Sequence, residues 1–331
     1  MNEFRALGGT IENVQLGEGP LGRGLFPIDP TRPLLIRIPE NLLVKKTDIV
    51  FENNVLKVAP NASLSERERR FYEDYYANLS WGVGGRAEVE RLFEQAQALP
   101  AELRHKLAAF YMLPQWFADP TEDTIQSNFI QSRKIGLKGH DVMMPFIELA
   151  NHGNEREYEA HDGLILQGAA QDEITVHYGN GDAYDLFCSF GFSAPADFAY
   201  SLPLKALIGE VPLLIDRSGG LPSGTDRPGY PKVRRDGALV RLDMCMLGNR
   251  RFPRFCRGNF RHALRAAGFR EVDETFDRIR QDNQLLFLSL LADLESLEGP
   301  MVRTLRQMAR FQLQAIAFCF GARETPLTRT P

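Results

Sequence analysis

Short apolar runs separated by turn residues fill the N-terminal part of the chain. The runs LLIRI at 34–38 and VLKVA at 55–59 are typical of strands, and glycine and proline residues punctuate the stretch at 17–33. No long helical period fits this region. We therefore expect residues 1–62 to form several short β-strands.

The pattern becomes helical after these strands. The run SLSERE offers an N-cap at Ser63, with Glu66 three residues later, ahead of the amphipathic FYEDYYANL. Two further helices are expected at about 87–99 and 101–112. Residues 63–135 are therefore predicted to form a helical block between two groups of strands.

Strand patterns return after the helical block and later give way to helices. The runs DVMMPF, GLILQG, ITVHY and AYSLPLKAL have the composition of strands. From about Arg257 the pattern is helical again, with long helices expected at 274–297 and 300–320. The sequence predicts an α+β fold in which helices interrupt and close a β-rich core. One side of the last helix carries a single polar residue, Gln312, among Leu305, Met308, Ala309, Ile316 and Cys319.

Composition places the chain among ordinary globular proteins. Of its 331 residues 44% are hydrophobic and 25% are charged, and 39 Lys and Arg against 43 Asp and Glu give a net charge of −4. The densest apolar run, LLFLSLL at 285–291, is far shorter than the ~18 residues of a membrane span, and MNEFRALGG does not resemble a signal peptide. We expect a cytoplasmic protein of about two domains, with no membrane partner.

Several motifs that suggest chemistry lack the context it requires. Gly17, Gly19 and Gly22 spell G-x-G-x-x-G, but prolines within and after the motif exclude the helix that a dinucleotide site needs. His152 and His161 flank an acidic patch without the spacing of metal ligands, so no metal site is predicted. Buried free thiols are expected for the four widely spaced cysteines, Cys188, Cys245, Cys256 and Cys319.

Positive charge is concentrated in one segment of this acidic chain. Seven arginines and no acidic residue lie between Met244 and Arg270, and removing their charges from the net −4 leaves −11 on the rest of the chain. The segment could be a solvated helix face paired with acidic residues, or a nucleic-acid surface. The pI of about 5.9 argues against nucleic acid. We favour a third interpretation, that Arg250–Arg270 docks an acidic stretch of a protein substrate.

Four separated parts of the chain together resemble the SET-domain methyltransferases, and within them the plant Rubisco large-subunit lysine methyltransferase type. These parts are LGRGLFP at 21–27 with LLIRIPENLLV at 34–44, FIQSR at 129–133, MPFIELANHG at 144–153, and DEITVHYGNGDAYDLFCSFGF at 172–192. In this family a helical insert splits a SET core of small sheets, which is the order expected here.

The resemblance implies a domain organisation. Residues 1–62 and 136–205 correspond to the two parts of the SET core, and 63–135 to the helical insert. The mostly helical remainder, 206–331, corresponds to a C-terminal substrate-binding domain. In the family the segment after the catalytic tyrosine passes under the strand that carries an Asn-His pair, in a knot-like C-terminal threading.

The resemblance further implies an S-adenosylmethionine-dependent protein-lysine N-methyltransferase. Gly22, Arg23 and Gly24 match the turn that touches the cofactor, where glycine lets the backbone approach closely. Arg133 matches an arginine whose planar fork can grip the cofactor carboxylate. The Asn151 amide would face the methionine end of the cofactor, and the backbone of His152 would pair with the adenine edge.

Tyr178 matches the catalytic tyrosine of the family, and its phenolic oxygen should point at the methyl group during transfer. A free lysine with a pKa of ~10.4 must lose a proton first, at a cost of about 4 to 5 kcal/mol at pH 7. Tyr158, Tyr178 and Phe190 would form the aromatic sleeve around a lysine of the protein substrate.

Two positions depart from the plant pattern. Phe190 replaces a tyrosine, and the lost hydroxyl predicts more than one methylation per lysine. Leu137 replaces a basic residue near the substrate. Both departures keep open an alternative function, a catalytically silent SET-fold module that binds a partner peptide.

Overall fold

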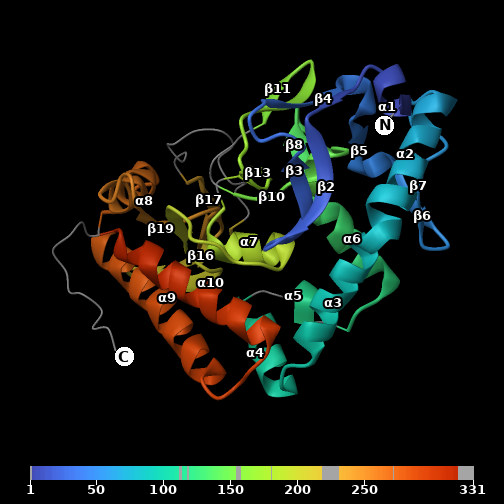
Figure 1. Ribbon diagram of the computed structural model, residues 1–331. Coiled ribbons are helices and arrows are strands. Elements are labelled where there is room, and N and C mark those ends of the chain that lie inside the picture. The colour runs from blue at the N-terminus through green and yellow to red at the C-terminus, as the bar shows by residue number, and fades with distance from the viewer. Residues whose placement is uncertain are drawn as a thin grey trace. The chain divides into compact units, whose positions relative to one another are not determined.

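The protein divides into two compact units, which are described separately (Figure 1). The first unit comprises Met1–Arg91 and Pro120–Tyr178, and the second comprises Leu92–Asp119 and Gly179–Pro331. Both units mix helices and strands, as the α+β prediction requires. The computed structural model describes residues 2–111, 114–117, 119–153, 158–179, 181–217, 231–270 and 272–319.

Several small sheets form the first unit, where short strands were expected. The four-stranded sheet has the order β1-β4-β12-β11, and alternate side chains of β4, such as Ile36 and Ile38, are fully buried. The remaining sheets pair β2 with β3, β6 with β7, β10 with β13, and β5 with β9 and β8. The strands are β1 (Thr10–Glu12), β2 (Val14–Gly19), β3 (Gly22–Pro27), β4 (Leu34–Pro39), β5 (Val44–Lys45), β6 (Ile49–Glu52), β7 (Val55–Val58), β8 (Lys134–Leu137), β9 (His140–Met143), β10 (Asn151–His152), β11 (Glu159–His161), β12 (Gly163–Gly168) and β13 (Thr175–Val176).

The G-x-G-x-x-G motif lies on the β2–β3 hairpin, drawn as adjacent blue arrows in Figure 1. Gly19 and Gly22 are the closing pair of this hairpin, and Gly22 has a φ of +93°, which favours glycine. Because the motif joins two antiparallel strands, the dinucleotide interpretation is excluded, as the prolines predicted.

Helix α2 begins two residues later than predicted. Its N-cap is Ser65, whose hydroxyl accepts from the Glu68 amide at 3.3 Å while the Glu68 carboxylate accepts from the Ser65 amide at 2.8 Å. Ser63 with Glu66, the predicted cap, has the same spacing, so the pattern alone could not choose between the two serines. The helices and turns of the helical block are α2 (Glu66–Leu79), η3 (Trp81–Gly85), α3 (Arg86–Gln97), α4 (Ala101–Tyr111), α5 (Pro114–Phe117) and α6 (Glu122–Arg133).

The helices of the predicted insert fall into both units. Helices α2 and α6 belong to the first unit, α4 and α5 belong to the second, and the division passes through α3. The first unit also contains α1 (Asn2–Ala6) and the short turns η1 (Glu40–Leu42), η2 (Lys46–Asp48) and η4 (Ile147–Leu149).

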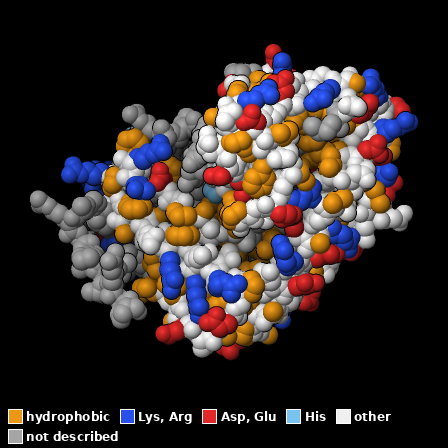
Figure 2. Space-filling model, in the orientation of Figure 1, with side chains coloured by type: hydrophobic (Ala, Val, Ile, Leu, Met, Phe, Trp, Pro, Cys, Tyr) orange, Lys and Arg blue, Asp and Glu red, His pale blue; other side chains and the backbone are white. Residues whose placement is uncertain are grey.

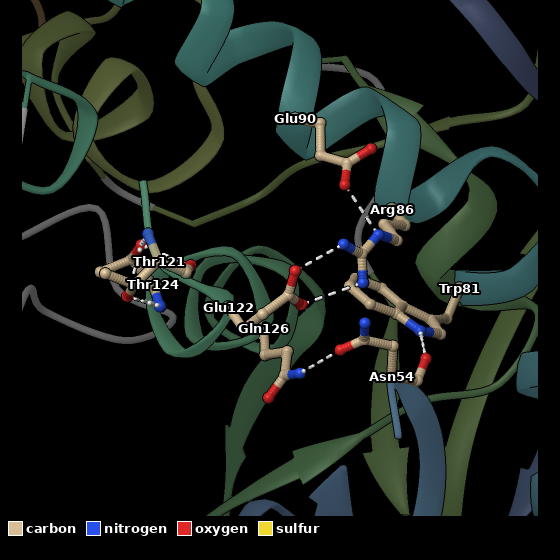
Figure 3. A network of polar contacts seen from close by, with 8 residues as sticks. All are labelled: Asn54, Trp81, Arg86, Glu90, Thr121, Glu122, Thr124 and Gln126. Atoms are coloured by element: carbon tan, nitrogen blue, oxygen red, sulfur yellow. Dashed lines mark hydrogen bonds and ion pairs between the residues drawn. The ribbon is translucent and has the colours of Figure 1, made fainter. Parts of the chain in front are cut away.

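A network of polar contacts fixes the bend between α2 and α3 (Figure 3). The Trp81 indole donates to the carbonyl of Asn54, in the β6–β7 turn, at 2.7 Å. Arg86 forms ion pairs of 2.7 Å with Glu90 and with Glu122, the first residue of α6. Each partly exposed ion pair contributes only about 0.2–1 kcal/mol, but together they join a hairpin turn and two helices to the bend.

The second unit contains a sheet that the sequence did not predict. Residues 206–331 were expected to be mostly helical, yet they supply most of a four-stranded sheet of order β15-β16-β18-β17. Its strands are short, and β17 contains three charged residues, so their apolar pattern is weak. The elements are α7 (Ala183–Phe190), β14 (Phe198–Tyr200), β15 (Leu204–Ile208), β16 (Val211–Ile215), β17 (Val233–Asp236), β18 (Leu239–Leu242), β19 (Met246–Asn249), α8 (Phe255–Ala266), α9 (Asp273–Leu294) and α10 (Pro300–Ala317).

The predicted apolar side of the last helix is confirmed. Helix α10 packs against α9, α7 and β19. The side chains on this side are all buried, including the amide of Gln312. The helical period therefore identified a core-facing surface correctly. The buried residues are Leu305, Met308, Ala309, Gln312, Ile316 and Cys319.

Within the described ranges, no helix is long and apolar enough to cross a membrane. Among the same residues, no group of three or more His, Cys, Asp or Glu side chains is arranged to hold a metal ion. Glu155 and Glu157 of the acidic patch lie outside the described residues. The four cysteines are free, and Cys188 is only partly buried whereas the other three are buried.

Candidate functional site

Three of the motifs that carry the resemblance meet in the first unit. Strand β10, with Asn151 and His152, runs parallel to β13, and the Gly153 amide donates to the Val176 carbonyl at 3.0 Å. The Ile174 amide donates to the carbonyl of Leu25, in the glycine hairpin, at 2.7 Å. Segments more than a hundred residues apart in sequence are therefore held together by backbone hydrogen bonds.

Gly24 lies against the side chains of this junction. A Cβ atom at Gly24 would clash with a carboxylate oxygen of Glu173 and would lie 2.8 Å from Nδ2 of Asn151. Any residue other than glycine would therefore push the Asn151 and Glu173 side chains away from the hairpin. The absence of a side chain at position 24 thus has a structural reason within the chain, and the close approach of this backbone to a cofactor stays a prediction.

Asn151 is tied to the hairpin through its amide nitrogen. Its Nδ2 donates to the Arg23 carbonyl at 3.1 Å and to Oε1 of Glu173 at 2.5 Å. The side chain is half-buried. The amide oxygen has no hydrogen-bond partner among the described residues and can accept from a ligand.

The Tyr178 hydroxyl lies beside the strand that carries Asn151. It donates to the carbonyl of Ala150 at 2.7 Å. Burial raises the pKa of the Tyr178 phenol, while the positive charge of Arg133 acts in the opposite direction. The phenol is therefore neutral at pH 7, and because its one hydrogen is donated to Ala150, its oxygen can only accept from further groups.

His152 is held as a neutral side chain. Its Nδ1 accepts from the Tyr178 amide at 3.3 Å, and the two rings lie 5.3 Å apart. Burial, and to a smaller extent the charge of His177, lower the pKa of His152 to about 4. The side chain is therefore uncharged at physiological pH, and the expected role of the His152 backbone stays a prediction.

Arg133, the last residue of α6, is mostly buried, with 15% of its side chain exposed. Its guanidinium pairs with the Glu88 carboxylate at 3.0 Å and lies 4.2 Å from the centre of the Phe129 ring. Its Nε is buried without a hydrogen-bond partner among the described residues. The arginine thus retains an unused donor beside a carboxylate that the sequence did not indicate.

Arg23 enters the site through its backbone. Its carbonyl accepts from Asn151, whereas its guanidinium donates to the carbonyls of Leu79 and Val83 at the bend between α2 and α3. Leu79 is the last residue of α2 and Val83 lies in η3, so the guanidinium caps the C-terminal end of α2. The side chain of Arg23 therefore joins the hairpin to the helical block.

A buried carboxyl group, Glu148, lies three residues before Asn151. Its two oxygens accept from the hydroxyls of Tyr75 and Tyr76 at 2.9 and 3.2 Å. Burial raises the pKa of Glu148, and the charge of Arg133 opposes the rise. The sequence motifs did not predict a role for this group, nor for Glu88 and Glu173. A lone acid inside the apolar run MPFIELA was the available signal.

Tyr158 and Phe190, the other two aromatic residues predicted to bind substrate, lie in other segments of the chain than Tyr178. Tyr158 is half-buried and directly precedes β11. Phe190 ends helix α7 of the second unit, and its ring lies 5.9 Å from that of Phe192. Their roles around a substrate lysine stay predictions, as does the threading of the segment after Tyr178.

The arginine-rich segment is largely paired within the second unit. Arg250 and Arg251 lie 3.9 and 3.3 Å from Asp197, and Arg257 and Arg261 pair with aspartates of α9. This pairing matches the interpretation as a helix face with internal ion pairs. Figure 2 shows Lys and Arg as well as Asp and Glu side chains on the face drawn. Docking of an acidic substrate stretch stays a prediction. The arginines of the segment without a described ion pair are Arg254, Arg265 and Arg270, which are exposed.

Comparison with known proteins gives distant matches among solved structures. No family model matches the chain, and no curated protein sequence matches it. A structure described as Rubisco LSMT bound to AdoMet is 15% identical, covers 95% of this chain and 89% of its own, and has a TM-score of 0.40. A structure of Rubisco LSMT described as bound to sinefungin and monomethyllysine is 12% identical, covers 96% and 88%, and has a TM-score of 0.39.

Proposed function

We propose that the protein is an S-adenosylmethionine-dependent protein-lysine N-methyltransferase. One observation carries the proposal: Tyr178 donates to the carbonyl of Ala150, next to Asn151, whose amide contacts the glycine hairpin at Gly24. A phenol oxygen that can only accept, an amide and a side-chain-free backbone thus adjoin one another. These are the three groups that the resemblance assigns to methyl transfer.

The residues fit the polar end of the cofactor. Arg133 has a buried donor without a partner, which suits a carboxylate. Asn151 has an amide oxygen without a partner, which suits an ammonium group. Gly24 lets the Asn151 and Glu173 side chains pack directly against the hairpin, which keeps the Asn151 amide at this position. When bound, the cofactor supplies an electrophilic methyl group on a sulfonium.

The roles of the chain's own residues follow from their protonation states. The Tyr178 phenol is neutral and donates its hydrogen to Ala150, so it cannot remove a proton from lysine as a phenolate. It can accept weak hydrogen bonds from a polarised methyl group and help to align it. His152 is neutral, its pKa is lowered to about 4 and its Nδ1 already accepts from the Tyr178 amide, so it is not the base that takes the lysine proton.

The test is methyl transfer to a protein. The purified chain is incubated with radiolabelled S-adenosylmethionine and host lysate, and the labelled peptide is sequenced. We expect label on a lysine side chain, and no label with Tyr178→Phe. Cofactor binding without transfer to any protein would contradict the proposal and favour a silent peptide-binding module. Label on another residue type would contradict the lysine assignment.

A further inference from the structure

The orientation of the Asn151 amide is fixed by two acceptors. Its Nδ2 lies 3.1 Å from the Arg23 carbonyl oxygen and 2.5 Å from Oε1 of Glu173. Neither group has a hydrogen to donate when the carboxyl is ionised. If the amide were turned over, its oxygen would face two oxygens with no hydrogen between them. The nitrogen must therefore face Arg23 and Glu173, and Oδ1 must face the other way.

The consequence is that Asn151 presents only an acceptor to a ligand. Both amide hydrogens are used, and Oδ1 has no partner in the described part of the chain. The side chain is only half-buried, so a ligand can reach it. An amide that is free to turn could bind either a carboxylate or an ammonium group, but this one can bind only a donor.

Glu173 lies close against the glycine hairpin. The next residue, Ile174, donates its amide to the Leu25 carbonyl of the hairpin at 2.7 Å, which holds the backbone of Glu173 beside it. Its oxygens lie over glycines of the hairpin: a Cβ at Gly24 would clash with Oε1, and one at Gly19 would lie 3.1 Å from Oε2. A hydrogen bond to an ionised carboxylate is also roughly twice as strong as a neutral one.

We infer that Glu173 is a positioning residue for ligand recognition: it holds the Asn151 amide so that Oδ1 accepts from the α-ammonium group of the cofactor. The inference rests on the proposed function and adds a residue to it. Arg133 and Asn151 then divide the two charges of the amino-acid group, because the arginine offers donors to the carboxylate and the amide offers an acceptor to the ammonium.

The test compares two ligands that differ in one group. The affinity for S-adenosylhomocysteine is measured by calorimetry beside that for the analogue lacking only the α-amino group. We expect the wild type to prefer the amine-bearing ligand by about 10- to 100-fold. Glu173→Leu, which removes the acceptor, should reduce this preference to roughly a third of its value or less. The affinity for the analogue without the α-amino group should change little. Glu173→Gln retains an acceptor and should retain more of the preference.

A double variant tests whether Glu173 acts through Asn151. Asn151→Ala should abolish the preference, and adding Glu173→Leu should change it no further. A wild-type preference in Glu173→Leu would overturn the inference, as would an equal loss of affinity for both ligands. If Glu173→Leu does not fold, Glu173→Gln decides: a preference above that of the wild type would contradict the inference. A wild type that binds neither ligand would instead overturn the proposed function.

Discussion

The Tyr178 hydroxyl donates a 2.7 Å hydrogen bond to the carbonyl of Ala150, the residue directly before Asn151. This bond uses the only hydrogen of the phenol and leaves its oxygen as an acceptor beside the Asn-His strand. The aromatic ring is held as well, because the centre of the neighbouring His152 ring lies 5.3 Å from its own.

Tyr178→Phe should lower the rate of methyl transfer by at least about 100-fold, because it removes a fixed polar atom at the reacting group. The affinity for the cofactor should change little. Single-turnover transfer of labelled methyl, with calorimetry of cofactor binding, measures both quantities. Tyr200→Phe is the matched control, since its buried hydroxyl has no partner among the described residues and its loss should leave transfer intact. Equal rates in both variants would contradict a catalytic role for Tyr178.

Arg133→Lys should weaken binding of S-adenosylhomocysteine by roughly 10- to 100-fold, since lysine keeps the charge but loses the planar fork. Glu88→Gln provides the contrast. It removes the carboxylate that lies 3.0 Å from the guanidinium and competes for it, so affinity should stay equal or rise. Calorimetry measures the affinity of both variants for S-adenosylhomocysteine. Similar losses in the two would mean that the ion pair, rather than the guanidinium itself, matters.

Gly24→Ala should destabilise the fold by about 1–3 kcal/mol, because the new Cβ would displace the Asn151 and Glu173 side chains. The same variant should lose cofactor affinity. Gly136→Ala is the matched control in the first unit: its Cβ would meet nothing within 4 Å, and its stability should change by less than about 0.5 kcal/mol. Urea unfolding of both variants measures the difference, and equal stabilities would refute the close approach.

The low pKa of His152, about 4, predicts a pH-dependent stability. The unfolded chain takes up a proton on this histidine below a pH of about 6.5, whereas the folded chain does so only near pH 4. The unfolded state therefore binds more protons in this window, and stability falls as pH falls through it. The contribution is about 1–2 kcal/mol once the partial exposure of the ring is allowed for.

His152→Gln should remove this dependence. Urea unfolding of the wild type and the variant at pH 4, 5, 6 and 7 gives the difference, which should grow from pH 4 to pH 7. Methyl transfer should show no step from His152 between pH 5 and 8, because the ring stays neutral there. A difference in stability that is constant with pH would contradict the burial of a neutral His152.

Local patterns were sufficient for much of the fold. The helical period identified the buried side of α10, and the prolines around the G-x-G-x-x-G motif excluded a dinucleotide fold. These features depend on periodicity and on backbone conformations that neighbouring residues set. Where two local signals were equal, as for Ser63 and Ser65, the sequence could not decide. The sheet of the second unit was missed because its strands are short and their apolar pattern is weak.

The motif residues of the candidate site could be predicted from the sequence, but their hydrogen-bond and ion-pair partners could not. Gly24, Asn151 and Tyr178 were named from the sequence, and the structure joins them in one unit. The partners that set their chemistry were not foreseen: Glu173 for the Asn151 amide, Glu88 for Arg133, and the tyrosines around Glu148.

The sequence by itself determined which segments form helices and strands, and which residue types are available for chemistry. Only the tertiary structure decided which carboxylate meets which donor, which amide hydrogens are used, and which side chains lose water. Hydrogen bonds act over a few ångströms and charges are screened within about 10 Å, so these choices depend on distances between residues that lie far apart in the chain. Side-chain spacing along one segment carries no information about such distances.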